Sequence, residues 1–323
     1  MSKFSDPLLN SIASRLEDSD PGVRRVAVMD LVDSPESEAV ELLIAALSDS
    51  DESVRMEAAK VIDEFEPRDM MGALVEALTA EDQNVRNAAA NALADLKDRN
   101  AAPALLEALK EDDPFVLSSI LRSLKQLRIK EARPHAIELL EHSDATVRRE
   151  AVSVLGYLQE TDNLPQLIAT ASKDADPEVR RTAVGALVYA EPSQVAKPLI
   201  VGLSDEHWQV RVEAAKGLGR LQVKSAVDPL IFATEDDMWQ VQEKAAEALG
   251  KIGSVTAIEA LAKCVTNPIS NLRKAAVAAV GEIGQPEGMS VVAVALNDND
   301  PDVRKLARWA KEQIETSHSA VGE

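Results

Sequence analysis

The sequence has few of the residues that build metal and redox sites. Its 323 residues include one cysteine and four histidines. A single cysteine excludes an internal disulfide and any metal site made of several thiolates. The histidines are His135, His142, His207 and His318; no two have the spacing His-x-x-x-His, and none is followed by Glu. We therefore expect neither a side-chain metal site nor a bound cofactor.

Basic residues and long apolar runs are also scarce. Lys and Arg total 35 against 55 Asp and Glu, which gives a net charge of −20. Nucleic-acid backbones and anionic lipids both bind clustered basic residues, so neither is an expected partner. No apolar run approaches the ~18–20 residues that span a bilayer. The N-terminus has no apolar stretch of the signal-peptide type, so we expect a cytoplasmic protein.

What the sequence has in abundance is an internal repeat. The pattern Asp-x-x-Val-Arg, followed by small residues and then Leu, recurs every 31 residues, with one interval of 32. Its Val, or the residue in its place, falls at Val23, Val54, Val85, Val116, Val147, Val179, Val210, Val241, Leu272 and Val303. The ten repeats fill almost the whole chain, which leaves no room for a separate catalytic domain.

Each repeat predicts two helices. Counting from the Val as zero, position −3 is mostly Asp, and Pro often follows, as in Asp20 and Pro21. Asp is a favourable N-cap, and Pro suits the first helical turn. Positions 0, +4, +5 and +8 are apolar, which is one stripe of a helix. A second apolar segment, such as 103–109, lies upstream of each Asp.

Neither helix of a repeat can bury its apolar stripe alone, so the repeats must stack. We therefore predict an all-α fold, a right-handed α-solenoid of about ten stacked helical hairpins. Residues 1–5 would lead into it, 6–315 would form the single solenoid, and 316–323 would be a disordered tail.

The repeats resemble HEAT repeats of the short type associated with phycobilisome lyases. The signature Asp-x-x-Val-Arg-x-x-Ala-Ala-x-x-Leu-Gly is clearest at residues 207–219 and 238–250. The resemblance covers about residues 6–315 and implies the solenoid fold. Its members include bilin lyase subunits, scaffolds and regulators. One HEAT-like enzyme, deoxyhypusine hydroxylase, holds a di-iron site with repeated His-Glu pairs; this sequence has none, so we reject that assignment.

Two rows of opposite charge follow the repeat. Position +1 is Arg in eight repeats, the exceptions being Leu117 and Gln242, and position −5 is acidic in seven. We interpret the rows as a ladder in which each Arg bridges acids of its own and adjacent repeats. The alternative is a row that binds external anions or phosphates.

Positions of the second helix that vary between repeats indicate a binding surface. These positions share one helix face, away from the apolar stripe. In the fourth to eighth repeats they carry five of the nine aromatic residues, and basic residues outnumber acidic ones. The candidate partner-binding residues are Phe115, Arg122, Arg149, Tyr157, Arg181, Tyr189, Trp208, Lys216, Arg220, Trp239, Lys244 and Lys251. For Trp208 and Trp239, packing against a neighbouring turn is an alternative to exposure in a groove.

These observations favour a non-enzymatic scaffold, adaptor or chaperone-like protein that holds a protein partner in a concave groove. No catalytic residue is predicted: the carboxylates fall on turns and solvent faces, and nothing in the sequence supports a reactive Cys264. The rival hypothesis is a bilin-lyase-like protein that holds a tetrapyrrole or its client. A DNA-binding glycosylase of the HEAT-like type ranks third, because its groove would need a strong positive excess. No pattern indicates an oligomeric state.

Overall fold

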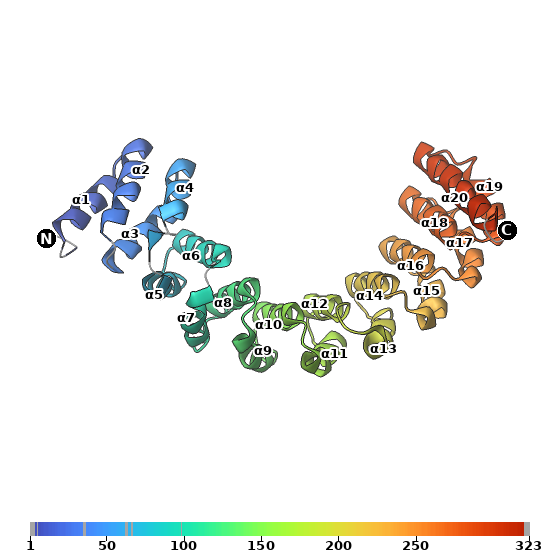
Figure 1. Ribbon diagram of the computed structural model, residues 1–323, viewed down its shortest axis with the longest axis horizontal. Helices are drawn as coiled ribbons and strands as arrows, with labels where there is room; N and C mark the ends of the chain where they lie inside the picture. The colour runs from blue at the N-terminus through green and yellow to red at the C-terminus, as the bar shows by residue number, and fades with distance from the viewer. Residues whose placement is uncertain are drawn as a thin grey trace. The chain divides into compact units, whose positions relative to one another are not determined.

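The computed structural model describes residue 4 and residues 6–34, 37–61, 64–65, 67–97 and 99–319, and these contain helices and no strand (Figure 1). The chain divides into two compact units, Met1–Leu158 and Gln159–Glu323, which we call the N-terminal unit and the C-terminal unit. Each is a stack of helical hairpins. The predicted all-α solenoid of stacked hairpins is confirmed.

In the N-terminal unit the first helices of the hairpins are the odd-numbered ones and the second helices the even-numbered ones. The bounds are α1 Pro7–Leu16, α2 Pro21–Met29, α3 Ser37–Leu47, α4 Glu52–Val61, α5 Pro67–Ala77, α6 Gln83–Asp95, α7 Ala102–Ala108, α8 Pro114–Leu127, α9 Arg133–Leu139 and α10 Ala145–Leu158.

The C-terminal unit continues the same alternation. Its helices are α11 Leu164–Lys173, α12 Pro177–Leu187, α13 Pro192–Gly202, α14 Trp208–Arg220, α15 Val227–Ala233, α16 Trp239–Ile252, α17 Ile258–Cys264, α18 Ser270–Ile283, α19 Met289–Ala295 and α20 Pro301–Ser319. Successive second helices, from α12 to α20, contact one another and form one layer; the first helices form the other (Figure 1).

Residue chemistry at the helix ends explains where the helices begin and stop. The Asp20 carboxylate accepts a hydrogen bond from the Gly22 amide at 2.8 Å, and Pro21 opens α2. Gly253 and Gly284 end α16 and α18 with φ of 75° and 65°. This left-handed conformation strains residues that carry a Cβ, so glycine is favoured at these helix ends.

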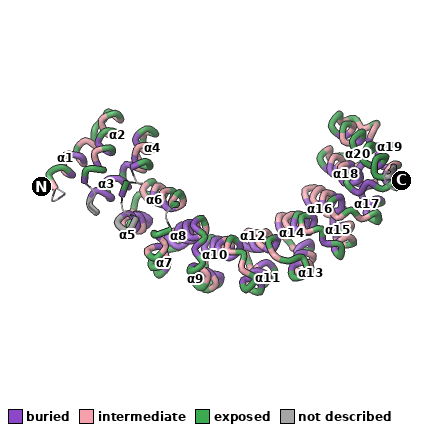
Figure 2. The backbone as a smooth tube through the Cα atoms, viewed as in Figure 1, coloured by how far each residue is buried: buried purple, intermediate pink, exposed green. Residues whose placement is uncertain are grey.

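The apolar stripe of the second helices forms the core. In α14 the side chains of Val210, Ala214, Ala215 and Leu218 are fully buried, as the repeat pattern predicts. Figure 2 shows buried residues where neighbouring helices face one another and exposed residues on the outer turns. Small residues in the stripe let the second helices approach closely.

The predicted ends of the solenoid coincide only partly with what the structure describes. Residues 1–3 and 5 of the expected lead lie outside the described residues, whereas Phe4 is buried and its amide donates to Asn10 Oδ1 at 3.0 Å. At the other end, α20 continues to Ser319, into the segment expected to be a disordered tail. Residues 320–323 lie outside the described part. None of the described helices is long and apolar enough to cross a membrane.

Candidate partner-binding surface

The arginine–aspartate ladder joins neighbouring hairpins at one end of the second helices. Arg180 donates from Nε and Nη2 to both carboxylate oxygens of Asp205, at 2.8 and 2.9 Å. The same bidentate geometry occurs, among the described residues, in the pairs Arg24–Asp49, Arg211–Asp236 and Arg273–Asp298. The predicted bridge to the acid of the adjacent repeat is therefore confirmed.

Within its own repeat, each of these arginines binds backbone instead of a carboxylate. Arg180 Nη1 donates to the carbonyl oxygens of Asp174 and Ala175, at 2.8 and 3.2 Å. The expected bridge to the acid of its own repeat is therefore wrong for Arg180, because Nη1 binds the carbonyl oxygens of the preceding turn instead. With a further bond to Glu206 at 3.2 Å, all five N–H groups of Arg180 are used, which leaves no donor for an external anion.

The two repeats without arginine lose both charges of the pair. Gln242 keeps the contact within its own repeat, because its Nε2 donates to the Asp236 carbonyl. The residue that would face an arginine at this position is Asn267, which carries no charge and accepts from the Ile269 amide at 2.9 Å. In the N-terminal unit, Leu117 likewise corresponds to His142 in the next repeat. At neither break does an acidic residue remain opposite the position where the arginine is missing.

In the N-terminal unit, two candidate arginines surround one carboxylate. Glu150 is only 6% exposed, and Arg122, Arg149 and Lys125 approach its carboxylate oxygens at 3.6, 3.8 and 3.2 Å. A buried carboxylate needs such compensation. These basic side chains thus have a structural role in addition to the binding role predicted for them.

The two aromatic candidates of the N-terminal unit lie at opposite ends of their helices. Phe115 is half-buried in the first turn of α8, and its amide donates to Asp113 at 2.8 Å. Tyr157, near the end of α10, is 50% exposed, and Lys125 Nζ lies 5.8 Å from its ring centroid. Tyr157 therefore offers an aromatic face, flanked by a cation, to solvent.

Three of the basic candidates in the C-terminal unit pair with acids of their own helix. The pairs are Arg181–Glu178 at 2.6 Å, Lys216–Glu213 at 3.5 Å, and Lys244 with Glu243 at 3.5 Å and Glu247 at 2.7 Å. Pairs on exposed helix surfaces contribute about 0.3–0.5 kcal/mol each, so a partner could replace them at little cost.

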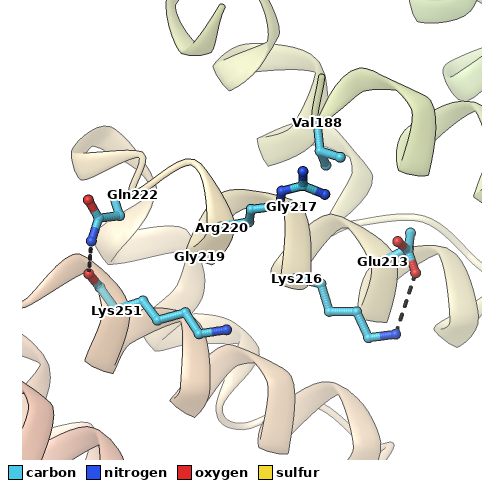
Figure 3. Close-up of a pocket in the computed structure, with 8 residues that line it drawn as sticks. All are labelled: Val188, Glu213, Lys216, Gly217, Gly219, Arg220, Gln222 and Lys251. Atoms are coloured by element: carbon cyan, nitrogen blue, oxygen red, sulfur yellow. Dashed lines mark hydrogen bonds and ion pairs between the residues drawn. The ribbon is translucent and has the colours of Figure 1, made fainter. Parts of the chain in front are cut away.

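Two other basic candidates make no salt bridge with any described residue. Arg220 stacks on Tyr189 instead, with Cζ 4.8 Å from the ring centroid, and Tyr189 is 55% exposed. Lys251 is exposed, and only its backbone carbonyl is bound, by Gln222 Nε2 at 2.8 Å (Figure 3). Both cations are therefore available to an external anion.

These basic side chains line a cavity of about 520 Å³ on the second-helix layer, which we call the basic cavity. Figure 3 shows them arriving from two successive helices, Lys216 and Arg220 from α14 and Lys251 from α16, with Arg220 reaching toward Val188. Gly217 and Gly219 lie on the same wall, where a Cβ would meet Val188 Cγ1 at 3.0 Å and Ala248 Cα at 2.7 Å, so glycine allows close packing there.

The two tryptophans of the predicted surface lie elsewhere. Trp208 and Trp239 are the first residues of α14 and α16, and both are half-buried. Neither lines a described cavity of the second-helix layer. Their contact with a partner stays a prediction, as does their packing role.

Sequence reasoning missed a third tryptophan. Trp309 in α20 is 37% exposed and lines a cavity of about 560 Å³ together with Ala278 and Leu306. A signal existed: Trp309 occupies position +6 of its repeat, whereas the repeat before it has the small residue Ala278 there. A large side chain such as Trp309 next to a small one such as Ala278 leaves a cavity above the small side chain.

The cysteine and the side chains of types that can hold a metal are the remaining reactive features of the described residues. Cys264 is buried, and burial raises the pKa of its thiol, which opposes formation of the reactive thiolate. Within the described chain, no group of three or more His, Cys, Asp or Glu side chains could hold a metal ion.

No curated protein sequence matches this chain. Among solved structures, the Escherichia coli protein YibA is 18% identical, with a TM-score of 0.54 over 83% of this chain and 98% of that one. Kap95p, in a structure with RanGDP, is 16% identical with a TM-score of 0.60 over 95% of this chain. The match spans 48% of Kap95p, about half its length.

A further likeness is to the karyopherin Kap121p, bound to the extreme C-terminus of the phosphatase Cdc14p. It is 16% identical with a TM-score of 0.53, over 95% of this chain and 41% of Kap121p. At such identities the likeness shows the fold. The sequence itself matches HEAT repeats over residues 9–70, 52–125, 71–139, 133–194 and 196–271, and the chain belongs to the HEAT-repeat family.

Proposed function

We propose that this protein is a non-enzymatic interaction scaffold or adaptor, and that the exposed face of the second helices binds a partner protein. The observation that carries the proposal is the exposed Tyr189 ring stacked on Arg220, beside a cavity in which two of the three cations, Arg220 and Lys251, make no salt bridge with any described residue. Tyr and Arg are among the residue types that dominate protein interfaces, since each buries a large area and still offers a polar group to the partner.

Proteins of similar fold bind protein partners: Kap95p binds RanGDP, and Kap121p binds the extreme C-terminus of Cdc14p. For this chain the partner surface follows the variable positions of the second helices. The whole chain has a net charge of −20, and its acidic surface outside the basic cavity would repel acidic surfaces that do not fit that cavity. The predicted cytoplasmic location stays a prediction.

A photo-crosslinking amino acid placed at Tyr189 tests this function. We expect irradiation in cells to join the protein to a partner that mass spectrometry identifies, because this side chain would lie in the interface. The matched control places the same group at Asp228, an exposed residue of the first helix α15. Absence of an adduct at position 189, or equal adducts at both positions, would contradict the proposal.

The rival function is a bilin-lyase-like or cofactor-handling role of the phycobilisome-lyase type. One observation favours it: a tetrapyrrole carries carboxylates and a flat conjugated face, which suit Arg220, Lys251 and Tyr189. A visible spectrum recorded after a bilin is added distinguishes the two functions. A bound-pigment band that disappears in Tyr189→Ala would favour the rival, and an unchanged spectrum of free pigment would favour the scaffold.

A further inference from the structure

Three cavities adjoin one another along the second helices of the C-terminal unit. Lys251 lines both the basic cavity and a second cavity of about 490 Å³ between α16 and α18. Lys274, Ala278 and Leu306 in turn line both this second cavity and the Trp309 cavity. The shared walls make the three one continuous groove across α14, α16, α18 and α20, helices that follow one another in Figure 1.

Close helix packing fixes the length of this groove. A Cβ on Gly219 would lie 2.7 Å from Ala248 Cα, and one on Gly250 would lie 2.6 Å from Ala279 Cα, so these helices touch through their backbones. Three interhelical steps of roughly 8–10 Å amount to roughly 24–30 Å. An extended peptide of about eight residues covers that distance at ~3.3 Å per residue.

The first end of the groove is positively charged. The basic cavity presents Lys216, Arg220 and Lys251 against one acid, Glu213. Only Lys216 is paired with it, at 3.5 Å. This end therefore attracts a carboxylate, and Arg220 of α14 and Lys251 of α16 are the lining cations that make no salt bridge with a described residue.

The middle of the groove is lined by three acids, Glu243, Glu247 and Glu282, against two cations, Lys251 and Lys274, which leaves one net negative charge. Glu243 and Glu247 share Lys244, and Glu282 makes no salt bridge with any described residue. Burial raises the pKa of the Glu282 carboxyl; Lys251 lowers it in part, and the neighbouring Glu247 raises it again. Lys251 is close enough to act on this carboxyl but forms no salt bridge with it, and a basic side chain of a ligand would supply a direct ion pair.

The far end of the groove is apolar. Trp309, Leu306 and Ala278 form its walls, and Lys274, Lys305 and Asp302 stand at its edge. Trp309 is fixed by its contact with the backbone of α18, because its Cζ3 would lie 2.5 Å from a Cβ on Gly281. A fixed aromatic wall over small residues suits a bulky apolar side chain.

From the order of these three regions, we propose that the groove binds an extended segment of a partner protein that carries an acidic residue, a basic residue and a bulky apolar residue in that spatial order. The acidic residue lies over Arg220 and Lys251, the basic residue over Glu247 and Glu282, and the apolar residue in the Trp309 cavity. This inference rests on the proposed function and specifies the chemistry of its partner.

Selection of randomised ten-residue peptides on the full-length protein tests the order. We expect the enriched peptides to place Asp or Glu, then Lys or Arg, then Trp, Phe or Leu along one direction of the chain. The double variant Arg220→Glu and Lys251→Glu should exchange the acidic position for a basic one and leave the other two unchanged. Lys197→Glu, on the exposed face of α13, is the matched control and should leave the selection unchanged.

The apolar end is tested separately with the best enriched peptide. We expect Trp309→Ala to weaken its binding about tenfold or more, as truncation of a central aromatic does. Ala278→Glu fills the same cavity without removing a packed side chain, so it should weaken binding even if Trp309→Ala lowers stability. Phe232→Ala, which removes an aromatic that is 81% exposed on α15, should leave binding unchanged.

The inference would be overturned if no peptide were enriched, or if the enriched peptides lacked this order. It would also be overturned if all variants bound the peptides equally. A partner crosslinked at position 189 would in that case leave the proposed function standing and reject only the groove. Failure of the crosslink would reject the proposed function itself.

Discussion

Asp205 accepts hydrogen bonds from two hairpins at once. Its Oδ1 binds the His207 amide of its own turn at 2.8 Å, and both its oxygens bind Arg180 of the preceding hairpin. Asp298 does the same with the Asp300 amide at 2.7 Å and with Arg273. One side chain thus shapes a turn and fixes the neighbour that packs on it.

This double use makes stability depend on pH. Hydrogen bonds from Arg273 hold the pKa of Asp298 below its usual value, against the opposing effect of burial. Because the pKa is lower in the folded state, the stabilisation is complete above the unfolded value of about 4 and is lost as the pH falls through the folded value. Asp49, beside Arg24, also has a lowered pKa and acts in the same direction.

We therefore predict that Asp298→Asn lowers the free energy of unfolding at neutral pH by about 1 kcal/mol. The variant should also lose less stability than the parent between about pH 5 and about pH 3, since one titrating group is gone. Urea unfolding across this pH range measures both effects. The control is Asp237→Asn, at an exposed position that makes no salt bridge with any described residue. Equal pH dependence in parent and Asp298→Asn would contradict the prediction.

At this scale the sequence predicted the partners well. The spacing places the Arg of one repeat beside position −5 of the next, so the pair Arg211–Asp236 follows from the repeat length and the acid at that position. The bonds from Arg211 Nη1 to the carbonyls of Asp205 and Glu206 could not be predicted, because they depend on how the turn exposes its backbone.

At the scale of helices, glycine at position +9 decides how closely the second helices pack. Gly219, Gly250 and Gly281 occupy this position in successive repeats, and each faces an alanine of the next helix. The contact is with backbone, which cannot rotate out of the way as a long side chain can. The added methyl group of an alanine would push the helices apart.

We predict that Gly250→Ala destabilises the protein by about 1–3 kcal/mol, because the new Cβ would lie 2.6 Å from Ala279 Cα. Gly72→Ala is the control: it lies inside α5, and nothing lies within 4 Å of the added Cβ. Its higher helix propensity should stabilise the protein by up to about 1 kcal/mol. Thermal unfolding of both variants measures the two effects. If Gly250→Ala were no less stable than Gly72→Ala, the packing argument would be refuted.

Helix positions were predictable from the sequence, and the cavities were not. Asp caps, Pro at the first turn and Gly at the last mark the ends of α2 and α16 as the structure has them. The Trp309 cavity arises between side chains of α18 and α20 that are far apart in the sequence. Its shape depends on which large residue faces which small one across two helices, and a single helix pattern does not contain that information.

On the scale of the whole molecule, stability is shared between neighbouring hairpins, as in other repeat proteins. The ladder in the C-terminal unit is continuous except where Gln242 and Asn267 replace the charged pair. Because both charges are absent, restoring only one would leave an ion without its partner.

We predict that the double variant Gln242→Arg and Asn267→Asp is more stable than the sum of its single variants by about 1 kcal/mol. In the single variant Asn267→Asp, the new carboxylate can still accept the hydrogen bond that forms the turn, but it has no arginine to pair with. This variant should therefore be neutral or destabilising. A double-mutant cycle by urea unfolding measures the coupling. The pair Asn299→Asp and Gln242→Arg, whose positions are not equivalent to the ladder, is the control; coupling of the same size there would show that the effect is general charge balance.

In the four bidentate pairs, the arginine of one hairpin finds its carboxylate 25 residues further on, in the next hairpin, and its carbonyls in the turn before it, as Arg180 does. If a segment of one full repeat is duplicated within this part of the chain, each copied arginine therefore meets an aspartate in the same place. The C-terminal unit can gain such a repeat by gene duplication without breaking an ion pair. Any such change would add one interhelical step of the groove and so alter how long a partner segment it holds.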